Sequence, residues 1–201
     1  MLSTYQLKSR FQSLLRPLAA RLYHTGVTAN QITIATCVIS LAIGITALRY
    51  PDRNYLFLLI SFWCPLRMAA NALDGMLARD FGQASRLGAV LNELGDVISD
   101  IALYLPFAFI AGSNPWLLVA IVLLSVLSEY SGVLAVLIGA ERRYDGPMGK
   151  SDRALVFGVT GLLAGSSVPL AAFINWLWAA VLVLLALTIF NRLKHGCAER
   201  V

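Results

Sequence analysis

Apolar stretches long enough to cross a bilayer recur along almost the whole chain. We place six of them, near residues 30–50, 54–78, 86–111, 115–140, 153–168 and 169–191. Each is close to the roughly 20 residues that a helix needs to span the hydrocarbon core. With 58% hydrophobic and 13% charged residues, the chain is too apolar for an ordinary soluble domain. The sequence predicts an all-α, polytopic membrane protein in which residues 1–201 form a single domain and residues 27–201 form a core of six transmembrane helices.

Residues 1–26 predict a helix of a different kind. Between Thr4 and His24, leucine and phenylalanine side chains recur at helical spacing, and basic residues lie among them. A helix with one apolar and one basic face lies in the membrane interface, here on the cytoplasmic leaflet. Pro17 is expected to bend or split this amphipathic helix.

Basic residues are distributed unevenly between the two sides of the predicted bundle. When the N-terminus is placed inside, only Arg49 and Arg53 of the 16 lysines and arginines lie outside, and Arg67 lies within a span. Cytoplasmic loops carry an excess of lysine and arginine, so both termini are predicted to be cytoplasmic. The net charge of +5 is then explained by this topology and by anionic membrane lipid, and not by nucleic acid.

Polar side chains share one face of the second span and one face of the third. At helical spacing they are Asn71 and Asp74 in the second, on one face with Ala78, and Asn92, Asp96 and Asp100 in the third, on one face with Gly88. Carboxylates inside apolar helices are costly, so they face a cavity, a metal or each other. Since the two spans run in opposite directions, Asp74 and Asp96 can reach comparable depths. Oxygen ligands on facing helices suit Mg²⁺ or Mn²⁺, which also bind phosphate oxygens.

The residues beside these carboxylates suit a phosphate group. Gly75 and Ala78 are small at a place where a ligand or a partner helix must come close. Arg79 can hold a phosphate through two parallel hydrogen bonds. Because a short turn joins the two spans, these residues lie close to the carboxylates, and together they predict a site for a metal and a phosphate.

This pattern resembles that of the CDP-alcohol phosphatidyltransferase family, D-x-x-D-G-x-x-A-R-x8-G-x3-D-x3-D. Here it reads Asn71-x-x-Asp74-Gly75-x-x-Ala78-Arg79-x8-Gly88-x3-Asn92-x3-Asp96, so six of the eight defining positions match. The segment Thr28-x-Asn30-x-x-Thr33 is similar to the family's T-P-N-x-x-T, with Ala29 in place of proline. More narrowly, the chain looks like the bacterial YnbA-like branch.

The resemblance implies a reaction, in which a phosphatidyl group moves from a CDP-linked lipid, most simply CDP-diacylglycerol, to a hydroxyl acceptor with release of CMP. Asp96 would take the acceptor proton, and Mg²⁺ or Mn²⁺ would clamp the pyrophosphate. The implied metal ligands are Asn71, Asp74, Asn92, Asp96 and Asp100, and the implied nucleotide and pyrophosphate residues are Asn30, Gly75, Ala78, Arg79 and Gly88. A homodimer in the bacterial inner membrane, with its active site facing the cytoplasm, is also implied.

Two positions depart from the family pattern. Asn71 and Asn92 stand where the pattern has aspartates, so four carboxylates become two. An amide oxygen attracts a divalent cation less than a carboxylate does, although Asp100 adds one charge a turn deeper. The interpretations that stay open are one metal, a shifted pair that uses Asp100, or a catalytically impaired protein that only binds a CDP-lipid. A small cation transporter that uses the intramembrane carboxylates is a further alternative.

Two charged residues inside other parts of the spans predict a buried ion pair. Arg67 precedes Asn71 by four residues and so shares its face, and a buried arginine needs a partner. Asp100 or Glu129 can supply it, and we expect Arg67 to pair with Glu129, which lies midway along the fourth span. The alternative is that Arg67 contacts a substrate phosphate.

The polar loop before the fifth span contains a basic cluster on the same side as the site. Its members are Arg142, Arg143, Lys150 and Arg153. They are predicted to bind a phosphate on the acceptor, by resemblance to family members that use phosphorylated alcohols. The other interpretation is that they set topology and attract anionic lipid. The four tryptophans are expected to be interfacial anchors or lipid contacts.

Overall fold

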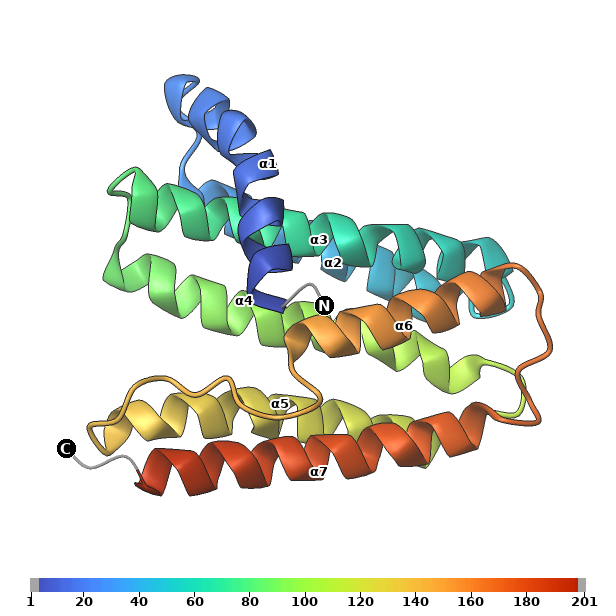
Figure 1. The fold of residues 1–201 in the computed structure, drawn as a ribbon. Coiled ribbons are helices and arrows are strands. Elements are labelled where there is room, and N and C mark those ends of the chain that lie inside the picture. The colour runs from blue at the N-terminus through green and yellow to red at the C-terminus, as the bar shows by residue number, and fades with distance from the viewer. Residues whose placement is uncertain (1–3, 199–201) are drawn as a thin grey trace.

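The structure is a computed structural model that describes residues 4–198, and the regular secondary structure within that range is all helical (Figure 1). The two ends of the chain, predicted to be cytoplasmic, lie outside it. The helices are α1 (Thr4–His24), α2 (Ala29–Arg49), α3 (Asn54–Asp80), α4 (Arg86–Tyr104), the 3₁₀-helix η1 (Leu105–Phe109), α5 (Pro115–Leu137), α6 (Lys150–Gly165) and α7 (Ile174–Ala198).

Four of these helices, α2, α3, α5 and α7, are long and apolar enough to cross a membrane. Helix α6 has 16 residues, and α4 has 19 residues that include three carboxylates. The all-helical membrane class is therefore confirmed, whereas the predicted number of six spans is not.

The last two helices begin at other residues than predicted. Helix α6 begins at Lys150 because the Asp152 carboxylate accepts a hydrogen bond from the Gly149 N–H at 2.9 Å, which satisfies a free donor at the helix start. Helix α7 begins at Ile174, since Pro169 and a turn closed on the Leu170 carbonyl come first.

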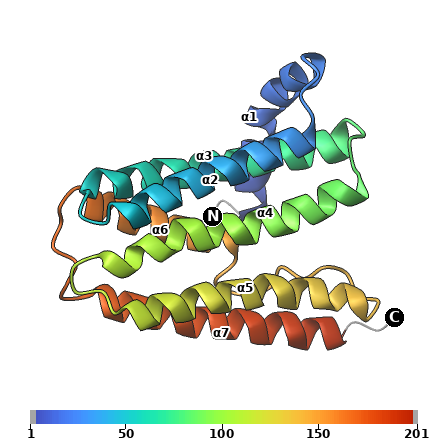
Figure 2. The same cartoon turned by 180° about the vertical axis from the view of Figure 1, so that it is seen from behind.

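The helices pack as two groups that α4 joins (Figures 1 and 2). Helix α3 packs against α2 and α6, and α2 also packs against α4. Helices α5 and α7 form a pair, and α4 contacts this pair through α5. Helix α4 is thus in contact with both groups and can carry residues from one to the other.

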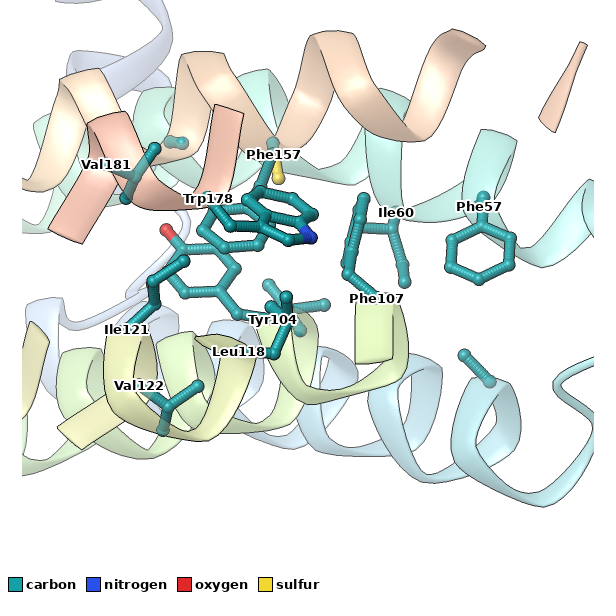
Figure 3. Close-up of a cluster of buried hydrophobic side chains, with 14 of the residues drawn as sticks. Phe57, Ile60, Tyr104, Phe107, Leu118, Ile121, Val122, Phe157, Trp178 and Val181 are labelled. Atoms are coloured by element: carbon teal, nitrogen blue, oxygen red, sulfur yellow. The ribbon is translucent and has the colours of Figure 1, made fainter. Parts of the chain in front are cut away.

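An aromatic cluster fills the core between the groups (Figure 3). The rings of Tyr104 and Phe157 stack with centroids 3.9 Å apart, and the Trp178 ring stacks on Phe157 at 5.4 Å. Trp178 is fully buried, and its indole N–H donates to Ser113 Oγ at 3.0 Å. The expectation that Trp178 is an interfacial anchor is therefore wrong, because α7 turns this side chain toward the core.

Helix α1 crosses the bundle at a steep angle (Figures 1 and 2). Its Ala19 is buried against Leu73 and Met76 of α3, and it runs through Pro17 without splitting. Leu14 on another face is 78% exposed. This two-sided character agrees with an amphipathic helix, and its place in the membrane interface stays a prediction.

Candidate functional site

A cavity of about 250 Å³ lies where the C-terminal part of α3 meets the starts of α2 and α4. Eight of its lining residues are ones that the motif predicted: Asn30, Asn71, Asp74, Gly75, Ala78, Arg79, Gly88 and Asn92. Two helix caps fix its rim. Thr28 and Gln31 form a capping box at the start of α2, and Ser85 Oγ accepts from the Gly88 N–H at the start of α4.

Asp74 is the buried carboxylate of the cavity wall. Its Oδ2 accepts a hydrogen bond from Thr33 Oγ1 of α2 at 2.7 Å. This bond fixes the orientation of the carboxylate from a second helix. Thr33 had no predicted role, although the segment Thr28-x-Asn30-x-x-Thr33 contains it.

Asp96 lies on α4 beside the cavity and faces α3 and α6. Its Oδ1 accepts from Asn71 Nδ2 at 2.8 Å and lies 3.4 Å from Arg67 Nη2, which also donates to the Asp96 carbonyl at 2.9 Å. The Lys150 ammonium contacts Oδ2. Groups from two other helices, α3 and α6, therefore hold the carboxylate that was predicted to act as the base.

Small residues allow polar groups to enter the cavity. A Cβ at Gly75 would lie 3.1 Å from both terminal nitrogens of Arg79, and one at Gly88 would lie 2.6 Å from Asn30 Oδ1. Within the described residues, no carboxylate pairs with Arg79, which is exposed. An unpaired guanidinium on a cavity wall can bind a phosphate through two hydrogen bonds.

Gln83 is a lining residue that sequence reasoning missed. Its Oε1 accepts from the Ala29 N–H at 2.7 Å, and its Nε2 donates to the Val27 carbonyl at 3.4 Å. These bonds tie the turn after α3 to the start of α2. No sequence signal marks this contact, because the residues that it joins are far apart in the chain.

A network of buried charges begins one helical turn below Asp96. Arg67 pairs with Asp100 at 2.5 Å, and Arg153 pairs with Asp100 and with Glu129, each at 2.9 Å. The expected pairing of Arg67 with Glu129 is therefore wrong, and Asp100 is its partner. Since guanidinium groups occupy both oxygens of Asp100, this structure offers no support for its predicted role as a metal ligand.

The network continues to α7. Arg192 is buried, lies 3.5 Å from Glu129 and donates to the Ser128 carbonyl. Sequence reasoning counted Arg192 only as a basic residue that sets topology. Its burial depends on how α5 packs against α7.

The four basic residues predicted to bind an acceptor each contact a carboxylate of the protein. They are Lys150 at Asp96, Arg153 in the buried network, Arg142 at Glu93 (2.7 Å) and at Glu129 of the network (3.3 Å), and Arg143 at Asp145 (2.8 Å). Hydrogen bonds from Arg143 hold the pKa of the Asp145 carboxyl below its usual range. Of the four, Lys150 is the one that contacts the predicted base.

The donor set of the cavity fits one divalent cation. No three His, Cys, Asp or Glu side chains come together to hold a metal in the part of the chain that the structure describes. Asp74 supplies a carboxylate there, and Asn71 and Asn92 supply amide oxygens. Mg²⁺ and chemically similar ions bind through one or two carboxylates together with substrate phosphates, for which the cavity has room.

The family model of the CDP-alcohol phosphatidyltransferases matches residues 26–190. The chain belongs to this family, as its motif predicted. Together with the four candidate spans, this establishes a membrane protein of the transferase family that synthesises phospholipids.

Two curated proteins and one solved structure are similar to the chain over nearly its full length. The chain is 48% identical to inner membrane protein YnbA of Escherichia coli and 28% identical to archaetidylinositol phosphate synthase of Aeropyrum pernix, and each match covers 96% of both chains. The crystal structure of Mycobacterium tuberculosis phosphatidylinositol phosphate synthase, in complex with manganese and citrate, superposes with a TM-score of 0.71. That match covers 92% of both chains at 21% identity, so it supports the fold.

Proposed function

We propose that this chain transfers a phosphatidyl group from a CDP-linked lipid, most simply CDP-diacylglycerol, to a hydroxyl acceptor. The oxygen of the acceptor forms a bond to the lipid-proximal phosphorus, the bond from that phosphorus to CMP breaks, and the acceptor proton leaves to the protein. The observation that carries the proposal is the cavity, which brings the motif residues of α2, α3 and α4 together beside Asp96.

The cavity would hold the nucleotide and its pyrophosphate. Arg79 has no carboxylate partner among the described residues, so its guanidinium is available to the pyrophosphate. Gly75 and Gly88 leave room for it and for Asn30. Asp74, Asn71 and Asn92 would hold Mg²⁺ or Mn²⁺. When bound, the cation supplies positive charge that offsets the charge on the leaving CMP.

Asp96 would take the proton of the acceptor hydroxyl. Its Oδ2 faces Lys150, whose long side chain is half-buried and can move when an acceptor enters. Arg67 and Asn71 hold Oδ1 and the backbone, so that Oδ2 keeps its place. Glycerol phosphate, serine, inositol phosphate and other hydroxyl compounds all stay candidates for the acceptor.

A second, apolar cavity would take an acyl chain of the lipid. It has a volume of about 370 Å³, lies between α3 and α6, and is lined by Cys64, Met68, Ser151, Ala154 and Val159 among others. Met68 follows Arg67, and Ser151 follows Lys150, so this cavity lies next to the residues around Asp96.

The membrane arrangement is part of the proposal. Helices α4 with η1 and α6 would cross the membrane with the four candidate spans, which gives six. The positive-inside rule then places both termini and the cavity on the cytoplasmic side of a bacterial inner membrane. A homodimer and contacts with anionic lipid are further parts of the proposal.

The test is CMP release by the purified protein in lipid, with CDP-diacylglycerol, Mn²⁺ or Mg²⁺ and a pool of hydroxyl acceptors. We expect acceptor-dependent release that falls by about 10²–10⁴-fold in Asp96→Asn, because that variant lacks the base. Asp74→Asn is expected to be similarly inactive. Asp80→Asn is the matched control, since Asp80 is exposed and lies outside the cavity lining.

Full activity in Asp96→Asn and Asp74→Asn would contradict these roles. Binding of the CDP-lipid without CMP release would instead identify a catalytically impaired member of the family. Both oxygens of Asp96 already face a donor, Asn71 at one and Lys150 at the other, so binding of the CDP-lipid should be measured separately from CMP release.

A further inference from the structure

Both oxygens of Asp96 face hydrogen-bond donors. Oδ1 accepts from Asn71 Nδ2 at 2.8 Å, and the Lys150 ammonium contacts Oδ2. An ionised carboxylate only accepts hydrogen bonds, so Asn71 must turn its nitrogen, and not its oxygen, toward Asp96. The N–H groups of Asn71 and Lys150 therefore occupy the positions beside the Asp96 carboxylate that a bound cation would need.

A cation at Asp96 would meet two obstacles. It would have to displace the Lys150 ammonium, and it would have to rotate the Asn71 amide, because an N–H group cannot coordinate a metal. The side chains of Asp96 and Lys150 are only 16% and 24% exposed, so the repulsion between an ammonium and a dication is screened less than at an open surface.

Asp74 has different surroundings. Its carboxylate accepts from the neutral hydroxyl of Thr33 at 2.7 Å, and within the described residues it forms no salt bridge. It lines the cavity together with Asn71 and Asn92. With its nitrogen turned to Asp96, Asn71 turns its oxygen away from Asp96. The conditions that favour a cation are thus met at Asp74 and not at Asp96.

We propose that Lys150 and Asn71 take the place of a second divalent cation, so that this site binds one Mg²⁺ or Mn²⁺, at Asp74. The Lys150 ammonium supplies at Asp96 the positive charge that a second cation would supply. The inference deepens the proposed function and rests on it in one respect, namely that a divalent cation binds beside the CDP-linked lipid.

The experiment counts bound Mn²⁺ on the full chain in lipid nanodiscs with CDP-diacylglycerol, by electron paramagnetic resonance. We expect one Mn²⁺ per chain at saturation, with the spectrum of an isolated ion. Two ions in one site lie about 3.5–4 Å apart and couple magnetically. A second Mn²⁺ with a coupled spectrum in the wild-type protein would overturn the inference.

Two variants separate the contributions of the amides and of Lys150. Asn71→Asp with Asn92→Asp restores the carboxylates, and the same pair with Lys150→Met also removes the ammonium. We expect the triple variant to bind a coupled Mn²⁺ pair, with a second-ion affinity at least about tenfold higher than in the double variant. Equal affinities in the two variants would overturn the role of Lys150.

The control is Lys194→Met, which removes an exposed lysine of α7 and should leave the count at one. If the triple variant does not fold, Lys150→Met alone gives the answer. We expect it to bind a weak second Mn²⁺ at concentrations where the wild type binds one, and no gain would overturn the role of Lys150.

Failure of this inference differs from failure of the proposed function. Two coupled Mn²⁺ in the wild type, with CMP release intact, would overturn the inference alone. No bound Mn²⁺ in the presence of the CDP-linked lipid would overturn both the inference and the metal dependence of the transferase.

Discussion

The cavity and the buried charge network share helices α3 and α4 but treat charge in opposite ways. In the network, Asp100 contacts both Arg67 and Arg153, and every one of these side chains is buried. In the cavity, Asp74 has a neutral hydrogen-bond donor, and Arg79 pairs with no carboxylate of the described residues. Where water is excluded, an unpaired charge costs several kcal/mol, so charges there are paired. Where a ligand enters, charge can be kept for the ligand.

Arg67 and Arg79 show the difference on one helix. Both lie on α3, yet Arg67 is 1% exposed and ion-paired, and Arg79 is exposed beside the cavity. Position along the helix therefore separates an arginine that stabilises the bundle from one that is available to a ligand. Each of the following substitutions tests one side of this comparison.

Arg153→Met should have the largest effect, on stability. It leaves Asp100 without one of its two cationic partners and Glu129 without its nearest one. Removing one partner of a buried ion pair destabilises a protein by about 3–5 kcal/mol. Thermal unfolding of the purified protein should show a large drop in Tm. A Tm equal to that of the wild type would mean that the network does not stabilise the fold.

Arg79→Met should have the opposite profile. We expect CMP release to fall by about 10²-fold, because a donor to a developing negative charge is lost. Stability should change by less than about 0.5 kcal/mol, since Arg79 is exposed. Arg79→Lys should recover part of the activity, as lysine binds phosphate without the bidentate geometry. Loss of stability instead of activity would place Arg79 with the network.

Thr33→Val tests the hydrogen bond that holds Asp74. The substitution keeps the shape of the side chain but removes the donor to the carboxylate. We expect the free energy of unfolding to fall by about 1.5–3 kcal/mol, because hydrogen bonds to charged groups contribute this much. Thr33→Ser keeps the hydroxyl and should stay close to the wild type. Equal losses in both variants would indicate a packing effect.

Val159→Trp tests whether the apolar cavity serves the same reaction as the polar one. A large ring at this position should fill the space between α3 and α6 and raise the KM for long-chain CDP-diacylglycerol by about fivefold. The KM for a short-chain analogue should not change. Val183→Trp is the control, because Val183 is 60% exposed on α7 and does not line this cavity.

Most of the cavity could be predicted from the sequence because its geometry is local. Residues 71–79 and 88–96 lie on consecutive helices joined by a short turn, and helical spacing fixes which side chains share a face. The cap at Thr28 also follows from local sequence. Spacing therefore placed Asn71 and Asp74 on one face of α3 and Asn92 on one face of α4, and both faces line the cavity.

Packing between helices fixes which charges are paired and which aromatic rings are buried. Arg67 of α3 finds Asp100 of α4, and Arg153 of α6 joins Asp100 to Glu129 of α5. From the sequence of each helix alone, several oppositely charged residues on other helices are equally good partners for its buried charge. The choice depends on how helices distant in sequence pack together, as does the burial of Trp178. Most helices and the motif face could be predicted because they depend on neighbours along the chain, whereas the ion pairs and the buried rings follow from the packing of the bundle.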